Sequence, residues 1–391
     1  MQVFRFVLVL LLLLVVEILR VYFIMPFPGS QAADTVHIAY WLDQHSWWIR
    51  LPLLLLLAFF TAPLWQLLGG RGKFLALLGV LVYAVVFYLF NFRFLADKMF
   101  YQPRVTSFLP VAAAGVANNK LVLGIEINGE AKAYPIQYIG YHHQVRDTVG
   151  GQPVMVTYCT VCRTGRVYSP LVNGKNEDFR LVGMDHFNAM FEDATTHSWW
   201  RQVSGEAITG PLKGQALKEL PSQQMQLSAW SRLHPSTLVM QADSNFSKQY
   251  EKLASYDRGN VKSSLEKRDS LSWQPKSWVL GMVVDNRAKA YDWNQLVQHR
   301  LLQDSFANLP FVITLEDDTA SFHALRRIVA NYSLSFKATA PNSMTDSRTG
   351  SVWTLDGKCI VGALKDSSLQ PIPVSQEFWH SWQTFHPATA K

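Results

Sequence analysis

The stretch Gly124-Ile-Glu-Ile-Asn-Gly-Glu-Ala-Lys-Ala-Tyr134 returns 157 positions later as Gly281-Met-Val-Val-Asp-Asn-Arg-Ala-Lys-Ala-Tyr291. Three further blocks return in the same order at offsets of 153 or 152: Asp193-x-x-Thr196-x-Ser198-x-Trp200 as Asp346-x-x-Thr349-x-Ser351-x-Trp353, Gly205-x-x-Ile208-x-Gly210 as Gly357-x-x-Ile360-x-Gly362, and Trp230…His234-Pro235 as Trp382…His386-Pro387. Ordered blocks at nearly constant spacing indicate a duplicated unit. We therefore predict two tandem repeats. Features that both copies keep are expected to serve the fold, and features of one copy are candidates for function.

Periodicity predicts that both repeats are mainly β. Leu121–Ile127 alternates and leads into Asn128-Gly129, a strong hairpin signal. Further strands are expected at Pro153–Tyr158, Arg166–Leu171, Trp278–Val284 and Phe311–Leu315, and short helices at Pro135–Tyr141, Ser228–Leu233 and Phe378–Phe385. Asp243–Gln274 is polar and indicates a linker or long excursion. The predicted domains are an anchor (1–100), a first β-rich repeat (101–242), a linker (243–275) and a second, degenerate β-rich repeat (276–391).

Three apolar runs before the repeats predict a helical membrane anchor. Phe6–Phe27 and Phe74–Phe92 are long enough to span a bilayer, which takes about 20 residues. Leu51–Leu68 is also apolar but contains Pro52 and Pro63, which makes it a weaker third span. Glu17 and Arg20 interrupt the first run on one helix face; we expect them in a salt bridge with each other or at an interface between spans.

Charge and aromatic residues bear on the location of the repeats. The loop after the first span carries Trp41, Trp47 and Trp48, as in an outer interfacial belt, and Arg71-Gly-Lys73 between the next two spans favours a cytoplasmic N-terminus. Arg93, Lys98 and Arg104 after the third span favour the opposite orientation. We place the repeats on the extracytoplasmic side of the cytoplasmic membrane. The net charge of +7 is spread along the chain without basic runs, which argues against a nucleic-acid partner.

Several motifs of the first repeat resemble the domain of unknown function 3179 family of bacteria and archaea. They are Gly129-Glu-Ala-Lys-Ala-Tyr-Pro135, Tyr141-His142 with Asp147-Thr-Val-Gly-Gly151, Val156-Thr-Tyr-Cys159-Thr-Val-Cys162, Asp193-x-x-Thr-x-Ser-x-Trp200 and Gly205-Glu-Ala-Ile-x-Gly210. The family signature is a Cys-Pro-Leu-Cys-Gly-like run after a strand. This chain departs from it with Thr160-Val161 between the cysteines and Arg163 after them. The resemblance implies an exported or membrane-attached protein but no established activity.

The Cys-x-x-Cys pair occurs in one copy only. Cys159 and Cys162 align with Glu316 and Thr319, although the preceding strand is kept. His142 and Asp147 align with His299 and Asp304, so these two residues are expected to be partly structural. The block Asp193-x-x-Thr-x-Ser-x-Trp200 is also shared, and it predicts a side-chain-capped turn packed on a tryptophan.

Three roles for the pair follow from its chemistry. Two thiolates suit copper or zinc, with His142 as a third ligand or supporting group and His143, His186 or His197 as alternatives. The pair also suits a thiol–disulfide couple of nucleophile and resolving thiol, in which Arg163 and Arg166 would stabilise the thiolate. In the third interpretation the cysteines are structural in an envelope scaffold or binding protein. Haem attachment is excluded because Arg163 stands where His is required.

Other candidate residues have weaker support. Cys359 aligns with Ala207 and is expected to be a small buried hydrophobic residue. We find no Ser-His-Asp order, phosphate-binding Gly loop or spaced carboxylate pair that would indicate an enzyme class. The leading hypothesis is a membrane-anchored protein that binds copper or zinc through Cys159, Cys162 and His142, with the thiol-redox and scaffold interpretations as alternatives.

Overall fold

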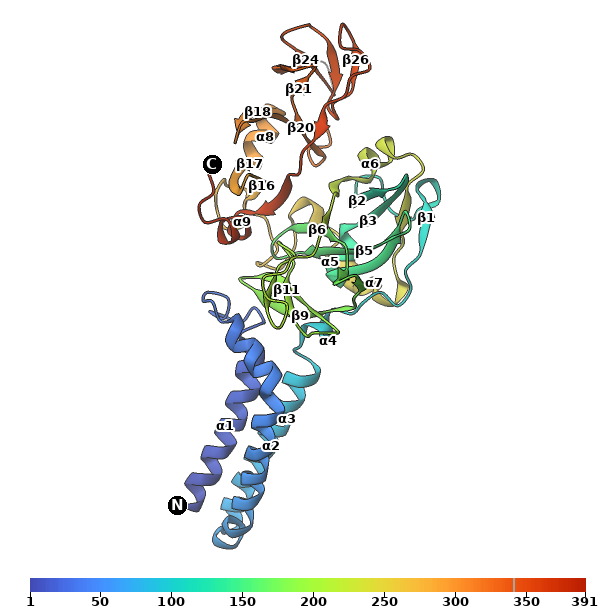
Figure 1. The fold of residues 1–391 in the computed structure, drawn as a ribbon. Helices are drawn as coiled ribbons and strands as arrows, with labels where there is room; N and C mark the ends of the chain where they lie inside the picture. Colours follow the sequence, from blue (N-terminus) through green and yellow to red (C-terminus); the bar gives the residue numbers. More distant parts are fainter. Residues whose placement is uncertain (340–341) are drawn as a thin grey trace. The chain divides into compact units, whose positions relative to one another are not determined.

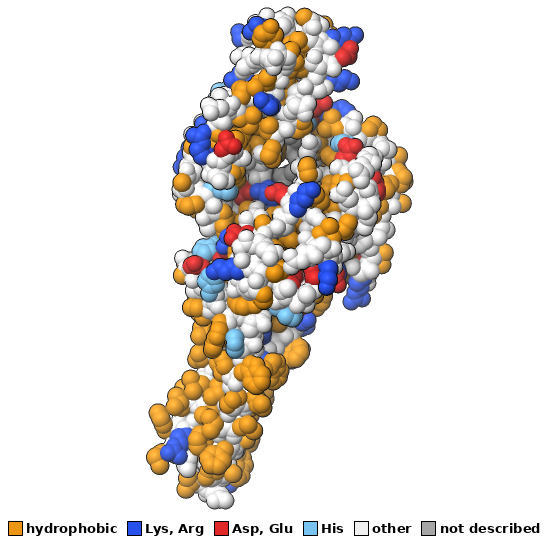
Figure 2. Space-filling view, viewed as in Figure 1, with side chains coloured by type: hydrophobic (Ala, Val, Ile, Leu, Met, Phe, Trp, Pro, Cys, Tyr) orange, Lys and Arg blue, Asp and Glu red, His pale blue; other side chains and the backbone are white. Residues whose placement is uncertain are grey.

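In the computed structural model, which describes residues 1–339 and 342–391, three long apolar helices begin the chain: α1 (Gln2–Tyr22), α2 (Val36–Leu67) and α3 (Gly70–Phe92). Figure 1 shows them running side by side, and Figure 2 shows hydrophobic side chains covering the visible face of this segment. Each is long and apolar enough to cross a membrane. The prediction of three such helices is confirmed.

The predicted span Leu51–Leu68 is the second half of the longer helix α2, which continues through Pro52 and Pro63. Trp41, Trp47 and Trp48 therefore lie on a helix, and the prediction that they belong to a loop was wrong. Their side chains are more than half exposed, Trp48 reaching 75%. An α-helix rises 1.5 Å per residue, so the 32 residues of α2 exceed the length needed for the hydrocarbon core.

Glu17 and Arg20 of α1 each pair with α2 and not with each other. The Glu17 carboxylate accepts two hydrogen bonds from Arg50, at 2.7 and 2.5 Å. Arg20 lies 3.2 Å from Asp43 and donates to Asn91 of α3 at 2.6 Å. Of the two predicted arrangements, the interface between helices is the one observed. Pairing of this kind reduces the cost of placing charged side chains in an apolar bundle.

A small sheet belongs to the same compact unit as the long helices. This unit comprises Met1–Tyr101 and Glu177–Ala216. Its sheet has the strand order β12-β11-β10-β9, and the short helix α4 contacts strand β9. The elements are α4 (Ala96–Met99), β9 (Phe179–Asp185), β10 (Asn188–Asp193), β11 (Trp199–Arg201) and β12 (Ala207–Thr209). Trp199 packs edge-on against Tyr40 of α2 at 5.2 Å between ring centroids, and the Met184 amide donates to the carbonyl of Ile24.

The second compact unit comprises Gln102–Asn176 and Leu217–Lys391. Its first part contains the sheets β1-β15-β3-β2-β14 and β13-β6-β5-β4 and the ribbon β7-β8. The elements are β1 (Phe108–Pro110), η1 (Val111–Ala113), β2 (Leu121–Ile127), β3 (Glu130–Pro135), α5 (Ile136–His142), β4 (Gln144–Val149), β5 (Gln152–Cys159), β6 (Thr164–Tyr168), β7 (Leu171–Val172), β8 (Lys175–Asn176), β13 (Glu219–Leu220), β14 (Gln223–Gln226), α6 (Leu227–Leu233) and β15 (Leu238–Met240).

The last part of this unit contains the sheets β17-β16-β28, β18-β19-β20-β27 and β23-β24-β25-β26 and the ribbon β21-β22. The elements are β16 (Trp278–Val284), β17 (Arg287–Asp292), α8 (Trp293–His299), β18 (Leu301–Phe306), β19 (Leu309–Leu315), β20 (Phe322–Arg326), β21 (Ile328–Val329), β22 (Tyr332–Ser333), β23 (Phe336–Ala338), β24 (Ser343–Asp346), β25 (Val352–Thr354), β26 (Cys359–Val361), β27 (Gln370–Pro371), β28 (Ser375–Phe378) and α9 (Trp379–Phe385). The predicted fold class, a helical segment followed by a β-rich region with some helices, is confirmed.

The elements after Trp278 follow those after Leu121 in the same order and pairing. The pair β2–β3 corresponds to β16–β17, the sheet β4–β5–β6 to β18–β19–β20, and helices α5 and α6 to α8 and α9. The register matches as well, since Gln144 opposes Thr157 and Leu301 opposes Thr314. The predicted domain boundaries, and the duplication itself, stay predictions.

The polar segment between the two sets of strands is ordered and packed. It contains η2 (Ser244–Phe246), α7 (Ser247–Lys252) and η3 (Tyr256–Arg258). Phe246, Tyr250 and Tyr256 are buried, Tyr256 completely. The segment contains few apolar residues, but its aromatic side chains pack into the core of the same unit and hold it in place.

Candidate functional site

The two cysteines lie on a hairpin that we call the thiol hairpin, formed by β5 and β6. Cys159 ends β5 and pairs with Thr164, the first residue of β6, so the connecting loop contains residues 160–163. Arg163 in this loop has a positive φ of 57°, which turns the chain back into the sheet. Neither Cys159 nor Cys162 has any exposed surface. The hairpin therefore buries both thiols within the protein.

Lys276 brings a positive charge to this pair. Its ammonium donates a 2.8 Å hydrogen bond to the carbonyl of Val161, between the two cysteines. Burial lowers the pKa of Lys276 to about 8, while the charges of Cys162, Cys159 and Glu266 act in the opposite direction. The electrostatic interaction with both thiols follows from this position.

His380 also contacts the Lys276 ammonium, with Nε2 3.3 Å from Nζ. Burial, together with the charge of Lys276, lowers the pKa of His380 to about 3. The imidazole is therefore neutral at physiological pH and can accept a hydrogen bond from the ammonium. Lys276 and His380 are both half-buried, in contrast to the fully buried thiols.

Strand β28 contacts the thiol hairpin directly. The amide of Phe378 donates to the carbonyl of Cys162 at 2.8 Å. Arg166 forms an ion pair with Glu377 at 2.7 Å, and Arg163 donates to Gln376 Oε1 at 2.9 Å. The two arginines predicted to stabilise a thiolate thus have partners on β28, and Lys276 interacts electrostatically with both cysteines. Stabilisation of a thiolate by Arg163 and Arg166 stays a prediction.

The segment between the two sets of strands contacts the loop of the thiol hairpin. Thr160 donates from its hydroxyl to Glu266 at 2.5 Å, and the Tyr256 hydroxyl donates to the Thr160 carbonyl at 2.8 Å. The Arg163 guanidinium stacks over the ring of Trp278 at 3.7 Å. The loop of four residues therefore contacts stretches that are distant from it in the sequence.

His142, the predicted third ligand, is fully buried in an aromatic cluster. Its Nε2 lies 2.7 Å from the Tyr250 hydroxyl, and its ring packs edge-on against Phe246. His143 binds the Tyr158 carbonyl through Nδ1 at 2.9 Å, and burial lowers its pKa to about 4. Both histidines are next to the strand that carries Cys159, in roles that already use a ring nitrogen.

The other two candidate histidines belong to the compact unit that contains the long helices, whereas the cysteines belong to the second unit. His186 Nδ1 lies 2.7 Å from Asp185, and the pKa of His186 is raised mainly by this hydrogen bond. His197 Nδ1 lies 3.2 Å from Glu192. Their observed partners are carboxylates.

Across residues 1–339 and 342–391, no group of three or more His, Cys, Asp or Glu residues is arranged to hold a metal ion, and no two cysteines stand at disulfide distance. The ligand set Cys159, Cys162 and His142, and its copper or zinc ion, stay predictions. Cys359 is fully buried in a cluster with Trp353 and Met344, and burial raises the pKa of its thiol. This confirms the prediction that Cys359 is a small core residue.

The shared aspartates have matching structural contacts. Asp147 binds Lys132 at 2.9 Å and the Tyr134 hydroxyl at 2.6 Å. At the matched positions, Asp304 binds the side chains of Lys289 and Tyr291, at 2.7 and 2.8 Å. The same geometry where the cysteines are absent supports a structural role for this aspartate.

The Asp-x-x-Thr-x-Ser-x-Trp blocks form the predicted capped turns. Asp193 accepts hydrogen bonds from the amide and hydroxyl of Thr196, from the Ser198 amide and from the Trp200 indole. Asp346 accepts the same four bonds from its own block, including one from the buried Trp353 indole at 3.2 Å. Each aspartate ties a turn to a buried tryptophan.

Lys276 and His380 were absent from the sequence-based set of site residues. Lys276 contacts the loop across 115 positions, and no spacing rule connects the two. One sequence signal could have placed the two residues near each other. Lys276 shortly precedes β16 and His380 shortly follows β28, and these two strands pair. Their approach to the thiol hairpin depends on how the two sets of strands pack.

Residues 101–389 match the family model described as "Protein of unknown function (DUF3179)". No curated protein and no solved structure matches the chain. The matched range covers the thiol hairpin, strand β28 and Lys276.

Proposed function

We propose that this chain, which belongs to the DUF3179 family, is a membrane-anchored thiol–disulfide protein whose reacting pair is Cys159 and Cys162. The observation that carries the proposal is the Lys276 ammonium bound to the peptide carbonyl between the two cysteines. A cation beside a cysteine stabilises the thiolate, the form that attacks disulfides. The three apolar helices supply the membrane anchor.

The chemistry is a two-electron exchange with a disulfide. A thiolate of the pair attacks one sulfur of the substrate disulfide, forming a mixed disulfide and releasing a substrate thiolate. The second cysteine, as thiolate, then attacks the mixed disulfide, which closes the Cys159–Cys162 bond and releases the other substrate thiol. The pair is oxidised by two electrons and the substrate is reduced by two. Lys276, with its pKa lowered by burial to about 8, can give a proton to a leaving thiolate near neutral pH.

Access to the sulfur atoms requires a local movement. Both thiols are fully buried, whereas Lys276 is half-buried. We therefore expect exchange to follow displacement of the Lys276 side chain, with the β5–β6 hairpin itself unchanged. The rate of exchange would then be slower than for an exposed pair with the same electrostatic environment.

Copper or zinc bound by Cys159, Cys162 and His142 is the alternative from the sequence. Thiolates fit either ion, but His142 Nε2 already binds the Tyr250 hydroxyl. A metal cation would also add positive charge where the Lys276 ammonium interacts with both cysteines. These two contacts favour the redox interpretation over the metal one.

The proposal includes an extracytoplasmic location for the β-rich region. Disulfides form and persist in such compartments, and a thiol–disulfide protein finds its substrates there. Reporter fusions at Lys391 test this location. Activity of a fused reporter that functions only in the cytoplasm would overturn the extracytoplasmic location.

The deciding experiment is a thiol count on the detergent-solubilised full chain, equilibrated in graded mixtures of reduced and oxidised glutathione and measured together with metal content. We expect two thiols to disappear together and return on reduction, in the wild type and in Cys359→Ser. In Cys159→Ser and in Cys162→Ser, the simultaneous loss of two thiols should no longer occur. A pair that stays reduced throughout, or one equivalent of copper or zinc lost in Cys159→Ser, would overturn the redox proposal.

A further inference from the structure

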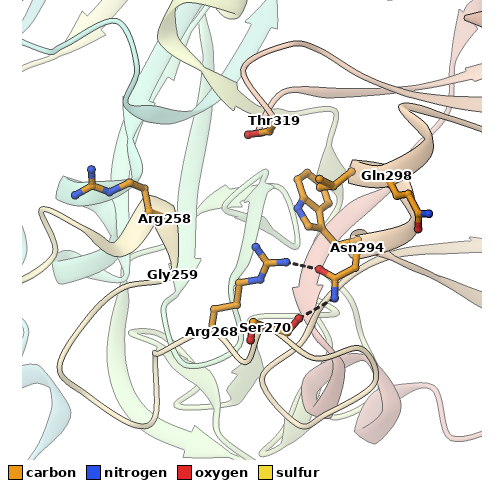
Figure 3. Close-up of a pocket in the computed structure, with 9 residues that line it drawn as sticks. Arg258, Gly259, Arg268, Ser270, Asn294, Gln298 and Thr319 are labelled. Carbon is orange, nitrogen blue, oxygen red and sulfur yellow. Dashed lines mark hydrogen bonds between the residues drawn. The ribbon is translucent and has the colours of Figure 1, made fainter.

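A pocket of about 590 Å³ lies in the second compact unit, and neither cysteine lines it. One wall comes from the segment that carries Arg258, Arg268 and Ser270, and the other from helix α8 with Trp293 and Asn294. Thr319, at its rim, lies in the β19–β20 loop. Figure 3 shows Arg268 directed into the space between these walls, whereas the guanidinium of Arg258 points away from it. A volume of this size suits a small organic molecule.

Arg268 is the charged group of the pocket. It donates to Asn294 Oδ1 at 2.7 Å, and its guanidinium stacks over the Trp278 ring at 4.1 Å. Its Nε is buried and makes no hydrogen bond with any residue in 1–339 or 342–391. Within those residues no carboxylate lies within ion-pair distance of Arg268. A guanidinium has five N–H donors, so most of its binding capacity is available.

The surroundings leave an excess of positive charge. Arg163 stacks over the same Trp278 ring at 3.7 Å and donates to the Gln376 amide oxygen and to main-chain carbonyls of η3. Asp292 also acts on Arg268, but its oxygens accept from the Asn294 amide and the Ser272 hydroxyl. Burial, and then the charge of Arg163, lower the pKa of Arg268 to about 10. An anion in the pocket would offset the free-energy cost of keeping the Arg268 guanidinium charged in this environment.

We propose that the pocket binds a small organic anion through a carboxylate or phosphate group held by Arg268. The planar fork of a guanidinium matches both groups. The hydroxyls of Ser270 and Thr319 border the pocket and can donate further hydrogen bonds. Val297, which is 37% exposed, supplies apolar surface for the body of the ligand. The site does not depend on the redox function proposed for the cysteines.

Isothermal titration of the detergent-solubilised full chain with benzoate, with inorganic phosphate and with neutral benzamide tests this proposal. We expect saturable binding of at least one anion and none of benzamide; the anion that binds identifies the carboxylate or the phosphate class. Arg268→Gln should weaken binding by about tenfold or more. Arg287→Gln is the matched control, because Arg287 also stacks on an aromatic ring, Phe306 at 5.3 Å, outside the pocket.

Val297→Trp provides a second variant that retains Arg268 and fills the pocket from a partly exposed position on α8. It should abolish binding while thermal unfolding remains close to wild type, which covers the case in which Arg268→Gln does not fold. Absence of binding of both anions at millimolar concentration would overturn the proposal. Equal affinity in the wild type and Val297→Trp would do the same.

Discussion

The thiol hairpin and its counterpart between β19 and β20 share their strand pairing and loop length but carry different side chains. In the counterpart, Glu316 occupies the position of Cys159 and its amide binds the Ser321 carbonyl, closing a loop of equal length. Glu316 accepts hydrogen bonds from His323 at 2.8 Å and Arg232 at 2.5 Å. The strand pattern therefore determines the hairpin, and the side chains that pack on it determine whether the end of its first strand carries a thiol or a hydrogen-bonded carboxylate.

The two hairpins are also covered reciprocally. Strand β28 contacts the thiol hairpin, and strand β14 and helix α6 contact its counterpart through Gln226 and Arg232. Gln224 and Gln376, matched positions 152 apart, bind each other at 2.8 Å. Contact between residues that the sequence comparison matches is the contact expected if the predicted repeats are related by a two-fold axis. Each hairpin thus owes its environment to the other half of the unit.

The largest expected effect concerns a contact present in both halves, in which a glycine packs against a tryptophan ring. A Cβ on Gly124 would lie 2.5 Å from the Trp230 ring, and one on Gly281 would lie 2.1 Å from the Trp382 ring. Gly124→Ala and Gly281→Ala should each lower the free energy of unfolding by about 3 kcal/mol, because buried indoles cannot move aside cheaply. Thermal unfolding of the detergent-solubilised chain measures this. Gly115→Ala, where the nearest atom is at 3.6 Å, is the control. Loss of stability in only one of the two variants would show that Gly124 and Gly281 do not have equivalent structural roles.

The next effect concerns Glu316, the carboxylate that stands at the position of Cys159 in the counterpart hairpin. Burial raises the pKa of Glu316, but hydrogen bonds from His323 and Arg232 outweigh it, so the pKa lies below its ordinary value of 4.5. The charged form therefore stabilises the fold above pH 4.5, and this contribution is lost as the pH falls through the lowered pKa. Glu316→Gln should cost about 1–2 kcal/mol at neutral pH.

The pH dependence of that loss is the informative readout. The difference in unfolding free energy between wild type and Glu316→Gln should shrink as the pH drops below 4.5, while other carboxylates affect both proteins equally. Arg300→Gln removes an exposed ion pair with Asp317 in the same region and should have a much smaller effect. A difference that does not change with pH would show that Glu316 acts through packing alone.

Local features were predictable because local chemistry determines them. Leu121–Ile127 is strand β2 to the residue, since its alternating pattern ends at an Asn-Gly turn. The capped turn at Asp193 followed from the spacing of its hydroxyls and tryptophan. Shared residues could be separated from unshared ones by comparing the two halves of the sequence, which identified the cysteine pair as the feature without a counterpart.

Features that depend on packing between distant segments were not predictable. Arg163 and Arg166 were predicted to be neighbours of a thiolate because they are close to Cys162 in the sequence, but the sequence did not predict their partners on β28. Lys276 reaches the loop from another part of the chain. The segment that carries Tyr256 resembled a linker by composition, although Tyr256 has no exposed surface. Sequence spacing contains no information on such contacts.

The smallest effect tests the cation that distinguishes the thiol hairpin. In a Cys359→Ser background only Cys159 and Cys162 remain to react with iodoacetamide. Lys276→Gln should slow their alkylation by less than about tenfold at pH 7, because the ammonium no longer stabilises the thiolate. Lys276→Arg should retain most of the rate. Lys267→Gln removes an exposed charge from the same segment and should have no effect.

The pH profile separates charge from access. Burial lowers the pKa of Lys276 to about 8, so above that pH the wild type also loses the ammonium. The rates of wild type and Lys276→Gln should therefore converge as the pH rises past 8. If Lys276 acted only by blocking access to the buried thiols, Lys276→Gln would react faster, by the same factor at every pH. That outcome would mean that no charge of Lys276 stabilises a thiolate in the thiol hairpin. Cys159 and Cys162 would then be core residues like Cys359.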